Sequence, residues 1–403
     1  MKSANLMIVQ GGGPTAVLNT SLASILDEAR VTGEFYRVFG SQRGILGLIE
    51  NAIIDLGALD EARLHSLRNS PGAALGSSRH QPGFEEMDRL VAHLRDLDIS
   101  HMLFMGGNGT MLGANRVAEA CRAAGLHIAI IGIPKTVDND LAVTDRSPGF
   151  GSAARYVAQS TRDLGMDLRS MPQPVTILET MGRSVGWLAA ASMLARERED
   201  DAPHLVYTPE LPFSPDAFLA DLDRIVTRQG WAVVVVSEGL QQAGGAPVYQ
   251  VTDASQSDPL RRPMIGGVAQ YLADFASSNL KLRCRSEKPG LLGRCSMLHV
   301  SEQDRLDAEL VGRAGVRALA ADMTGKMVAL TSIRNQVGSG YVLVPLRAVA
   351  GLERPIPSDW ITNGETSLSP DLREYLTPLV GSLPPYIAPL QTMELKKESS
   401  ANA

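Results

Sequence analysis

Short apolar segments alternate with longer amphipathic segments along this chain of 403 residues. The apolar segments are continuous rather than alternating, which is typical of parallel strands covered on both faces. The amphipathic segments have the length of helices that bury one face. Strands are predicted at Leu6–Val9, Met102–Met105, Ile128–Ile133, Val175–Leu178, Ala232–Val236 and Met327–Leu330, and helices at Ala16–Ala29, Glu85–Leu97, Asn115–Ala124, Ser152–Leu164, Ser184–Arg196 and Pro215–Arg228.

The repeated order of strand and helix predicts an α/β protein with doubly wound, Rossmann-like parallel sheets and right-handed crossovers. In such sheets, ligands bind at the carboxyl ends of the strands. Unusual residues follow four of the predicted strands, so we expect these four loops to form one site. The loops are Gly11–Gly13, Gly106–Thr110, Pro134–Asp140 and Ser237–Gly239.

Composition and charge exclude several classes of protein. At roughly 100–200 residues per domain, the chain holds two or three domains. The net charge of -6 argues against nucleic acid or an anionic membrane as partner. Three cysteines without CxxC spacing argue against a disulfide framework or a structural zinc site. We find no signal peptide and no apolar stretch near the roughly 18 residues of a membrane span, and therefore expect a soluble cytoplasmic protein.

The two glycine-rich loops suit an anion. Gly11–Gly13 precedes a predicted helix, whose backbone amides and dipole attract negative charge, and Gly106–Thr110 repeats the arrangement. A tight structural turn is the alternative for each loop taken alone. Neither loop is a Walker motif, and the first strand–helix turn lacks the Gly-x-Gly-x-x-Gly dinucleotide fingerprint.

The loop Pro134–Asp140 combines a lysine, a hydroxyl and two carboxylates directly after an apolar strand. One carboxylate near a substrate hydroxyl can accept its proton, and a second can hold Mg²⁺ between phosphate oxygens. A lysine supplies a point charge for phosphate. Together with the glycine loops, this segment favours phosphoryl transfer over a solvated polar turn.

These residues carry a family resemblance that covers nearly the whole chain. The loop PKTVDND at 134–140 resembles the catalytic loop of phosphofructokinases. Four further segments match signatures of that family and occur in the same order along the chain: GSSR at 76–79, GFGSAARY at 149–156, MGR at 181–183 and SEG at 237–239. The C-terminal half is similar to the bacterial pyrophosphate-dependent branch, through R-x-x-x-x-H at 294–299, WI..G at 360–364 and YLTPLVG at 375–381.

The resemblance implies a role for each matching residue. Asp138 would be the general base, Thr136 and Lys135 would contact the transferring phosphoryl group, and Arg183 would stabilise the transition state. Asp140 and Asn108 would hold Mg²⁺. The donor would lie against Gly11, Gly12, Gly107, Asn108, Gly109 and Arg79, and the sugar phosphate against Met181, Gly182, Glu238, Arg294 and His299.

The sequence leaves open the identity of the phosphoryl donor and of the acceptor. Pyrophosphate users in the family usually combine a lysine at the position of Lys135 with an aspartate at that of Gly109, and only the lysine is present. Where ATP users have a metal-binding aspartate, this chain has Asn108, and Pro174 stands where many members place an arginine for the sugar phosphate. Pyrophosphate and fructose 6-phosphate are the expected substrates, and ATP or a related sugar phosphate is the alternative.

The resemblance also implies an architecture. We expect two α/β domains facing a cleft: residues 1–148 with about 300–330 bind the donor, 149–299 with about 331–350 bind the sugar phosphate, and 351–403 form an extension with a disordered tail. Family members are homodimers or homotetramers, so we expect a homo-oligomer.

Two other classes stay possible, a catalytically weak regulatory paralogue and a hydrolase or oxidoreductase on a similar fold. Intact Asp138, Asp140 and Arg183 oppose the first, and the missing dinucleotide fingerprint opposes the second.

Overall fold

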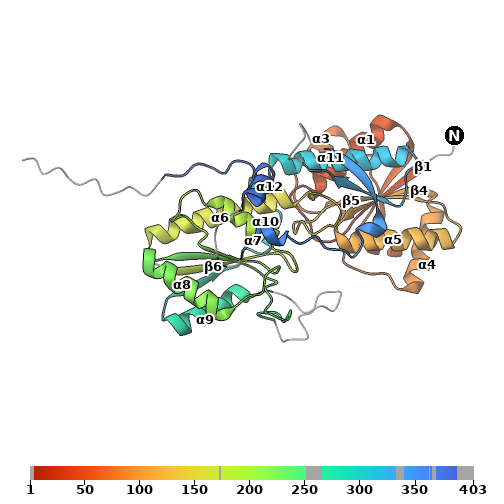
Figure 1. Ribbon diagram of the computed structural model, residues 1–403. Coiled ribbons are helices and arrows are strands. Elements are labelled where there is room, and N and C mark those ends of the chain that lie inside the picture. Colours follow the sequence, from red (N-terminus) through yellow and green to blue (C-terminus); the bar gives the residue numbers. More distant parts are fainter. Residues whose placement is uncertain are drawn as a thin grey trace, which may run out of the picture.

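The computed structural model describes residues 4–171, 174–250, 266–332, 340–362, 364 and 369–387, and Figure 1 shows two α/β domains joined along α6 and α12. The first domain contains β1 (Ala4–Gln10), β2 (Phe35–Ser41), β3 (Ile53–Asp55), β4 (Ile99–Gly106), β5 (Ala129–Pro134), β10 (Lys326–Leu330) and β11 (Tyr341–Pro345). Its helices are α1 (Leu18–Thr32), α2 (Ile45–Glu50), α3 (Glu61–Arg68), α4 (Phe84–Asp96), α5 (Asn108–Ala123), α11 (Glu302–Ala320) and the 3-10 turn η3 (Leu346–Ala348).

The second domain is smaller. Its strands are β6 (Val175–Thr180), β7 (Leu205–Tyr207), β8 (Ala232–Ser237) and β9 (Cys284–Glu287). Its helices are α6 (Phe150–Ser170), α7 (Trp187–Ala191), α8 (Pro215–Gln229), α9 (Val268–Leu280), α10 (Leu291–Arg294) and α12 (Pro370–Val380), with 3-10 turns η1 (Ser192–Ala195), η2 (Met297–His299) and η4 (Ser358–Trp360). None of the described helices is long and apolar enough to cross a membrane.

Both sheets are largely parallel, as predicted. The first has the order β11-β10-β5-β4-β1-β2-β3, in which only the edge strands β11 and β3 are antiparallel to their neighbours. The second has the order β7-β8-β6-β9 and is parallel throughout. In the first domain, α1 and α11 pack on one face of the sheet and α4 and α5 on the other (Figure 1). In the second, α8 and α9 cover one face and α6 and α7 the other.

The helix boundaries follow from local sequence. At the start of α8, the Ser214 hydroxyl accepts a hydrogen bond from the Ala217 amide, and Pro215 occupies the first turn, where its missing N–H costs nothing. At its end, Gly230 adopts a left-handed conformation with φ 85°, which lets its amide bond to the Val226 carbonyl. Caps of this kind fix where each helix meets the sheet.

Strand register brings the predicted loops to one rim. Gln10 of β1 pairs with Met105 of β4, and Gly106 of β4 pairs with Pro134 of β5. The loops after these three strands therefore leave the first sheet side by side. In the second sheet Thr180 pairs with Ser237, which brings the loops after β6 and β8 together in the same way.

One predicted domain boundary was wrong. We expected residues 331–350 in the second domain, but β11 pairs antiparallel with β10, and Val344 and Leu346 are buried in the core of the first domain. The chain crosses between the domains near residues 149 and 300, and its third crossing comes after η3 rather than near 330. The extension beyond 350 packs on the second domain, because Leu372 and Leu376 of α12 are buried in its core. The predicted disordered tail at 394–403 lies outside the described residues.

Candidate active site

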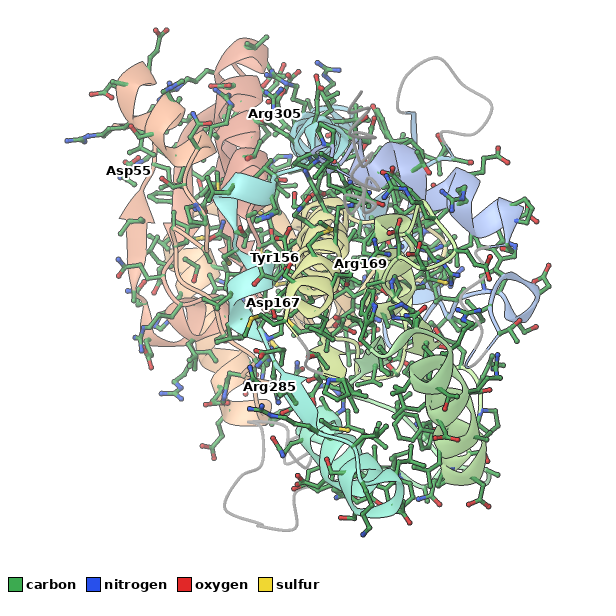
Figure 2. All side chains as sticks on the ribbon, turned by 90° about the vertical axis from the view of Figure 1, so that its left-hand side faces the viewer. Asp55, Tyr156, Asp167, Arg169, Arg285 and Arg305 are labelled. Carbon is green, nitrogen blue, oxygen red and sulfur yellow. The ribbon has the colours of Figure 1, made fainter. Side chains whose placement is uncertain are left out.

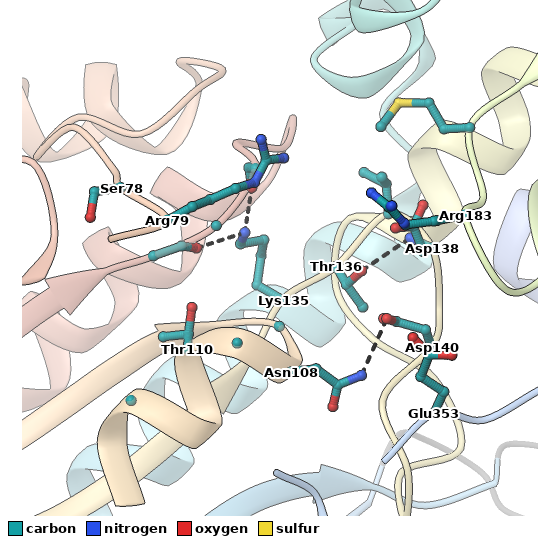
Figure 3. A pocket seen from close by; sticks show the side chains of 18 of the residues that line it. Ser78, Arg79, Asn108, Thr110, Lys135, Thr136, Asp138, Asp140, Arg183 and Glu353 are labelled. Carbon is teal, nitrogen blue, oxygen red and sulfur yellow. Dashed lines mark hydrogen bonds between the residues drawn. The ribbon is translucent and has the colours of Figure 1, made fainter. Parts of the chain in front are cut away.

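A cavity of about 640 Å³ lies between the domains and is lined by the rim loops of both (Figure 3). Sixteen predicted site residues were named from the sequence, and fourteen of them line it, all except Gly182 and His299. The contributing segments are the loops after β1, β4, β5, β6 and β8, the loop at residues 78–81, Arg294 at the end of α10, and Glu353.

The glycine loop after β4 is itself the start of a helix. α5 begins at Asn108 rather than at the predicted Asn115, so the free amides of its first turn and its positive dipole end lie at the cavity wall. α1 begins at Leu18, two residues after the predicted start, so Pro14–Val17 separate the Gly11–Gly13 loop from the helix. A Cβ atom at Gly11 would overlap the Thr110 side chain, which explains why these two loops can pack so closely.

Lys135 lies at the junction of the two glycine loops. Its Nζ donates hydrogen bonds to the carbonyl oxygen of Gly11, at 2.9 Å, and to that of Gly13. The residue is only 3% exposed. Burial, followed by repulsion from Arg294 and Arg79, lowers the pKa of Lys135 to about 7. A phosphate beside this ammonium group would favour its charged form.

Asp138 has the environment of a general base. Its amide donates to Thr136 Oγ1 at 3.1 Å, which turns the loop, and its Oδ1 atom is buried without a hydrogen-bond partner among the described residues. Burial and the charges of Asp140 and Glu238 raise the pKa of Asp138 to about 7. A carboxylate with a pKa near the working pH is well suited to proton transfer.

The next carboxylate in the loop suits a metal ion. Asn108 Nδ2 donates to Asp140 Oδ2 at 3.2 Å, while the Oδ1 atoms of both side chains are buried without a hydrogen-bond partner among the described residues. Mg²⁺ prefers such oxygens and is usually held by one or two carboxylates together with substrate phosphates. The described residues contain no group of three His, Cys, Asp or Glu side chains that could hold a metal ion alone. The two oxygens therefore fit a magnesium ion that arrives with phosphate.

Residues of the second domain form the opposite wall. Met181 and Arg183 follow β6, Glu238 follows β8, and all three line the cavity. Burial and the nearby Glu179 raise the pKa of Glu238 to about 7. Arg294 reaches towards the first domain. Its Nη1 atom lies 3.1 Å from the position that a Cβ atom at Gly13 would occupy.

Two predicted substrate ligands lie outside the cavity lining. Gly182 stands between two lining residues, but its carbonyl accepts a 2.6 Å hydrogen bond from Ser237 Oγ, which braces the loop. His299 Nδ1 is 2.7 Å from Ser296 Oγ, and its ring packs edge-on against Tyr156. Figure 2 shows Tyr156 on the side of α6 that faces α10. In this chain His299 packs α6 against η2, as hydrogen-bonded histidines beside a core often do.

Several lining residues were not predicted from the sequence. Gln81 is the nearest side chain to Gly109, and its Nε2 atom lies 3.9 Å from the position that a Cβ atom at Gly109 would occupy. The cavity wall at Gly109 therefore has room for a larger group. Glu353 lies at the exposed rim beside Asp140, because residues 141 and 353 form a bridge between their backbones (Figure 3). No local pattern identifies Glu353, since it lies outside the helices and strands and more than 200 residues after the catalytic loop. The other unpredicted polar lining residues include Ser78, His80 and Thr110.

Comparison with known proteins agrees with this geometry. The phosphofructokinase family model matches residues 5–319. The pyrophosphate–fructose 6-phosphate 1-phosphotransferase of Xanthomonas campestris is 36% identical over 94% of this chain and 92% of its own length. The sulfofructose kinase of Alkalicoccus urumqiensis is 36% identical over 88% of this chain and 91% of its own. A crystal structure of the pyrophosphate-dependent phosphofructokinase of Nitrosospira multiformis superposes with a TM-score of 0.84 at 32% identity and covers 96% of this chain and 94% of that one. This chain therefore has the phosphofructokinase fold and belongs to the phosphofructokinase family.

Proposed function

We propose that the protein transfers a phosphoryl group from pyrophosphate to the 1-hydroxyl of fructose 6-phosphate, giving fructose 1,6-bisphosphate and phosphate. The observation that carries this proposal is the position of Lys135. Its ammonium group occupies the junction of the glycine loops, where it can neutralise a small inorganic donor. The similarity to pyrophosphate–fructose 6-phosphate 1-phosphotransferases supports the same substrates.

Asp138 accepts the proton of the sugar hydroxyl as the hydroxyl oxygen attacks the phosphorus atom. The bond between phosphorus and the bridging oxygen breaks, and its electron pair leaves with orthophosphate. Charge that develops on the transferring group is met by Lys135, Thr136 and Arg183, all of which line the cavity. Arg79 binds the donor on the side of the first domain.

Magnesium bound with the donor would offset the negative charge of its phosphate groups. Asp140 and Asn108 would hold the ion through their buried Oδ1 atoms. Because an asparagine contributes no charge, Asp140 alone would leave the ion with one carboxylate from this loop. Glu353 offers a second at the rim of the cavity.

The proposed reaction is a step of glycolysis. It is reversible, because pyrophosphate and the sugar bisphosphate are phosphoryl donors of similar energy. We further propose a cytoplasmic homo-oligomer, a homodimer or a homotetramer, as the resemblance to the family suggests. The three cysteines are free, as expected for reduced thiols.

The direct test incubates the purified protein with pyrophosphate, fructose 6-phosphate and Mg²⁺ and follows fructose 1,6-bisphosphate and orthophosphate by ³¹P NMR. We expect the two products in equal amounts, and formation of both at least about 10²-fold slower with the Asp138→Asn variant under the same conditions. Pyrophosphate hydrolysis without bisphosphate would refute the transferase assignment.

ATP is the second candidate donor, and the open wall at Gly109 favours it. The nearest side-chain atom lies 3.9 Å from the position that a Cβ atom at Gly109 would occupy. The apolar side chains of Ile45 and Phe104 also line the cavity. A nucleoside could enter this space. Gly109→Asp would oppose a nucleotide by its size and charge, so any ATP-driven turnover should fall in this variant while pyrophosphate-driven turnover persists.

A related sugar is the alternative acceptor. One similar protein is a sulfofructose kinase, and a sulfonate carries less charge than a phosphate dianion. Pro174, which precedes β6, supplies no cation to the sugar wall. Comparing kcat/KM for fructose 6-phosphate and 6-deoxy-6-sulfofructose decides between them, and we expect the phosphate ester to be preferred.

A further inference from the structure

The C-terminal segment reaches the catalytic loop from a part of the chain that the family model does not match. That match ends at residue 319, whereas Arg354 and Tyr375 lie well beyond it. The Arg354 amide donates to the Asp140 carbonyl at 2.8 Å, so the segment is attached to the same loop that carries Asp138.

Asn139, between the two aspartates, has an unusual backbone conformation. Its φ is +57°, in the left-handed region that costs most residues energy and that asparagine tolerates better than most. Its side chain is only 1% exposed. Because of this turn, Asn139 packs inward while the flanking residues Asp138 and Asp140 line the cavity.

Three hydrogen bonds hold Asn139 in this conformation. Its Nδ2 donates to the hydroxyl oxygen of Tyr375 at 2.8 Å, and its Oδ1 accepts from the Ser147 amide at 3.1 Å. Its carbonyl accepts from Arg354 Nη2 at 3.2 Å. Two of the three partners therefore come from the C-terminal segment.

Tyr375 connects several parts of the site. It is 3% exposed, and its hydroxyl donates to the Asp145 carbonyl at 2.7 Å while accepting from Arg354 Nη2 at 3.0 Å. The guanidinium of Arg354 stacks 4.4 Å from the ring centre of Trp187, whose Nε1 donates to the Arg354 carbonyl at 3.0 Å. We call Asn139, Trp187, Arg354 and Tyr375 the Tyr375 cluster.

The Tyr375 cluster joins both walls of the cavity. Asn139 belongs to the loop of Asp138 in the first domain, and Trp187 begins α7 four residues after Arg183 in the second. We propose that the cluster is a positioning element, which sets Asp138 relative to Arg183 across the bound phosphoryl group. None of its four members lines the cavity, so each would act through its neighbours rather than on substrate.

The proposal rests on the proposed function only through the roles of Asp138 and Arg183. Its test therefore uses whichever donor and acceptor support wild-type turnover, and each variant is compared with wild type under those conditions. An inactive wild-type protein would refute the proposed function, whereas an effect confined to the variants bears on the cluster.

Tyr375→Phe keeps the ring and removes the hydroxyl. We expect kcat to fall by about tenfold or more, because small displacements of reacting groups can cost up to about 10²-fold, while both KM values change less than about threefold. Tyr207→Phe is the matched control. Tyr207 is also 3% exposed, but among the described residues its hydroxyl has no hydrogen-bond partner, so this variant should keep wild-type kcat.

Asn139→Gly tests the same contact from the other side. Glycine adopts a positive φ freely, so the backbone turn persists while the side-chain hydrogen bonds to Tyr375 and to the Ser147 amide are lost. We expect a similar loss of kcat when the variant is assayed well below its own melting temperature, where it is folded and a purely structural role would leave kcat unchanged. If either folded variant keeps more than half of the wild-type kcat, or if the KM values rise instead, the cluster does not position the catalytic groups. Should Tyr375→Phe fail to fold, Asn139→Gly decides alone.

Discussion

The two walls of the cavity are built differently. On the first-domain wall, Lys135 and Asn108 are fixed by contacts within that domain, because Lys135 binds the Gly11 carbonyl and Asn108 binds Asp140. On the second-domain wall, Arg294 extends across the cavity, and its Nε atom has no hydrogen-bond partner among the described residues. Preorganised groups stabilise charge without rearranging at the moment of reaction. We conclude that Lys135 and Asn108 are placed for chemistry in advance, and we propose that Arg294 gains order when the sugar phosphate binds.

The largest effect should come from the base on the first wall. Asp138→Asn removes the proton acceptor but keeps the shape of the side chain, so kcat should fall by about 10²–10⁴-fold with little change in KM. Steady-state kinetics of the folded variant measure this. A variant with half of the wild-type kcat would remove Asp138 from the role of base.

The same wall should make activity strongly dependent on pH. Asp138 must be ionised to accept a proton, so kcat/KM should rise with pH up to about 7. Lys135 must be charged to bind phosphate, so kcat/KM should fall above about 7. The profile should be bell-shaped and fall by about tenfold per pH unit on either side. An unchanged kcat/KM between pH 6 and 9 would contradict both assignments.

Lys135→Gly separates the two donors. The substitution removes a cation and creates space, so pyrophosphate-driven kcat/KM should fall by at least about tenfold, the effect of one lost charged contact. ATP-driven turnover should hold or rise. Equal losses with both donors would mean that Lys135 supports the loop rather than selecting the donor.

Arg294→Ala tests which wall Arg294 serves. As a ligand of the sugar phosphate, its loss should raise KM for fructose 6-phosphate by about tenfold, since a charge-assisted hydrogen bond is worth roughly 1.5–3 kcal/mol. The KM for pyrophosphate should stay the same. A rise in the pyrophosphate KM alone would assign Arg294 to the donor, as its approach to Gly13 would also allow.

The smallest effect is expected at the rim. Glu353→Gln should raise the Mg²⁺ concentration needed for half-maximal rate by about two- to fivefold, because exposed charges contribute only about 0.2–1 kcal/mol. Binding of Mn²⁺ followed by electron paramagnetic resonance gives the same comparison without turnover. Glu374→Gln, on the exposed surface of α12, is the control and should bind the metal as wild type does. Equal metal affinity in both variants would exclude Glu353 from the site.

The first wall was predictable because its chemistry is local in sequence. Each loop follows a continuous apolar strand, and strand register alone brings Gly11, Gly107 and Lys135 together. Among the strands that escaped prediction, β2 (FYRVFGS) and β9 (CRSE) have mixed or polar patterns, whereas β7 (LVY) is apolar but only three residues long. Edge positions and partial exposure remove the continuous apolar signal on which the prediction relied.

The contributions of the C-terminal segment could not be predicted in the same way. Glu353 and Tyr375 reach the catalytic loop only after a third crossing between the domains, and the family resemblance had implied that this crossing comes near residue 330. β11 was missed although Val342–Val344 is apolar, because this edge strand is short and Val344 is the only one of its residues that is buried. Contacts of this range depend on the packing of whole domains, which a local pattern does not encode.

The most direct test of the account compares kcat/KM for pyrophosphate and for ATP on the wild-type protein, with fructose 6-phosphate and Mg²⁺ held constant. If Lys135 decides the donor, pyrophosphate should be preferred by at least about tenfold, the worth of one charged contact. A kcat/KM for ATP well above that for pyrophosphate would contradict the account, because the open wall at Gly109 would then outweigh the lysine.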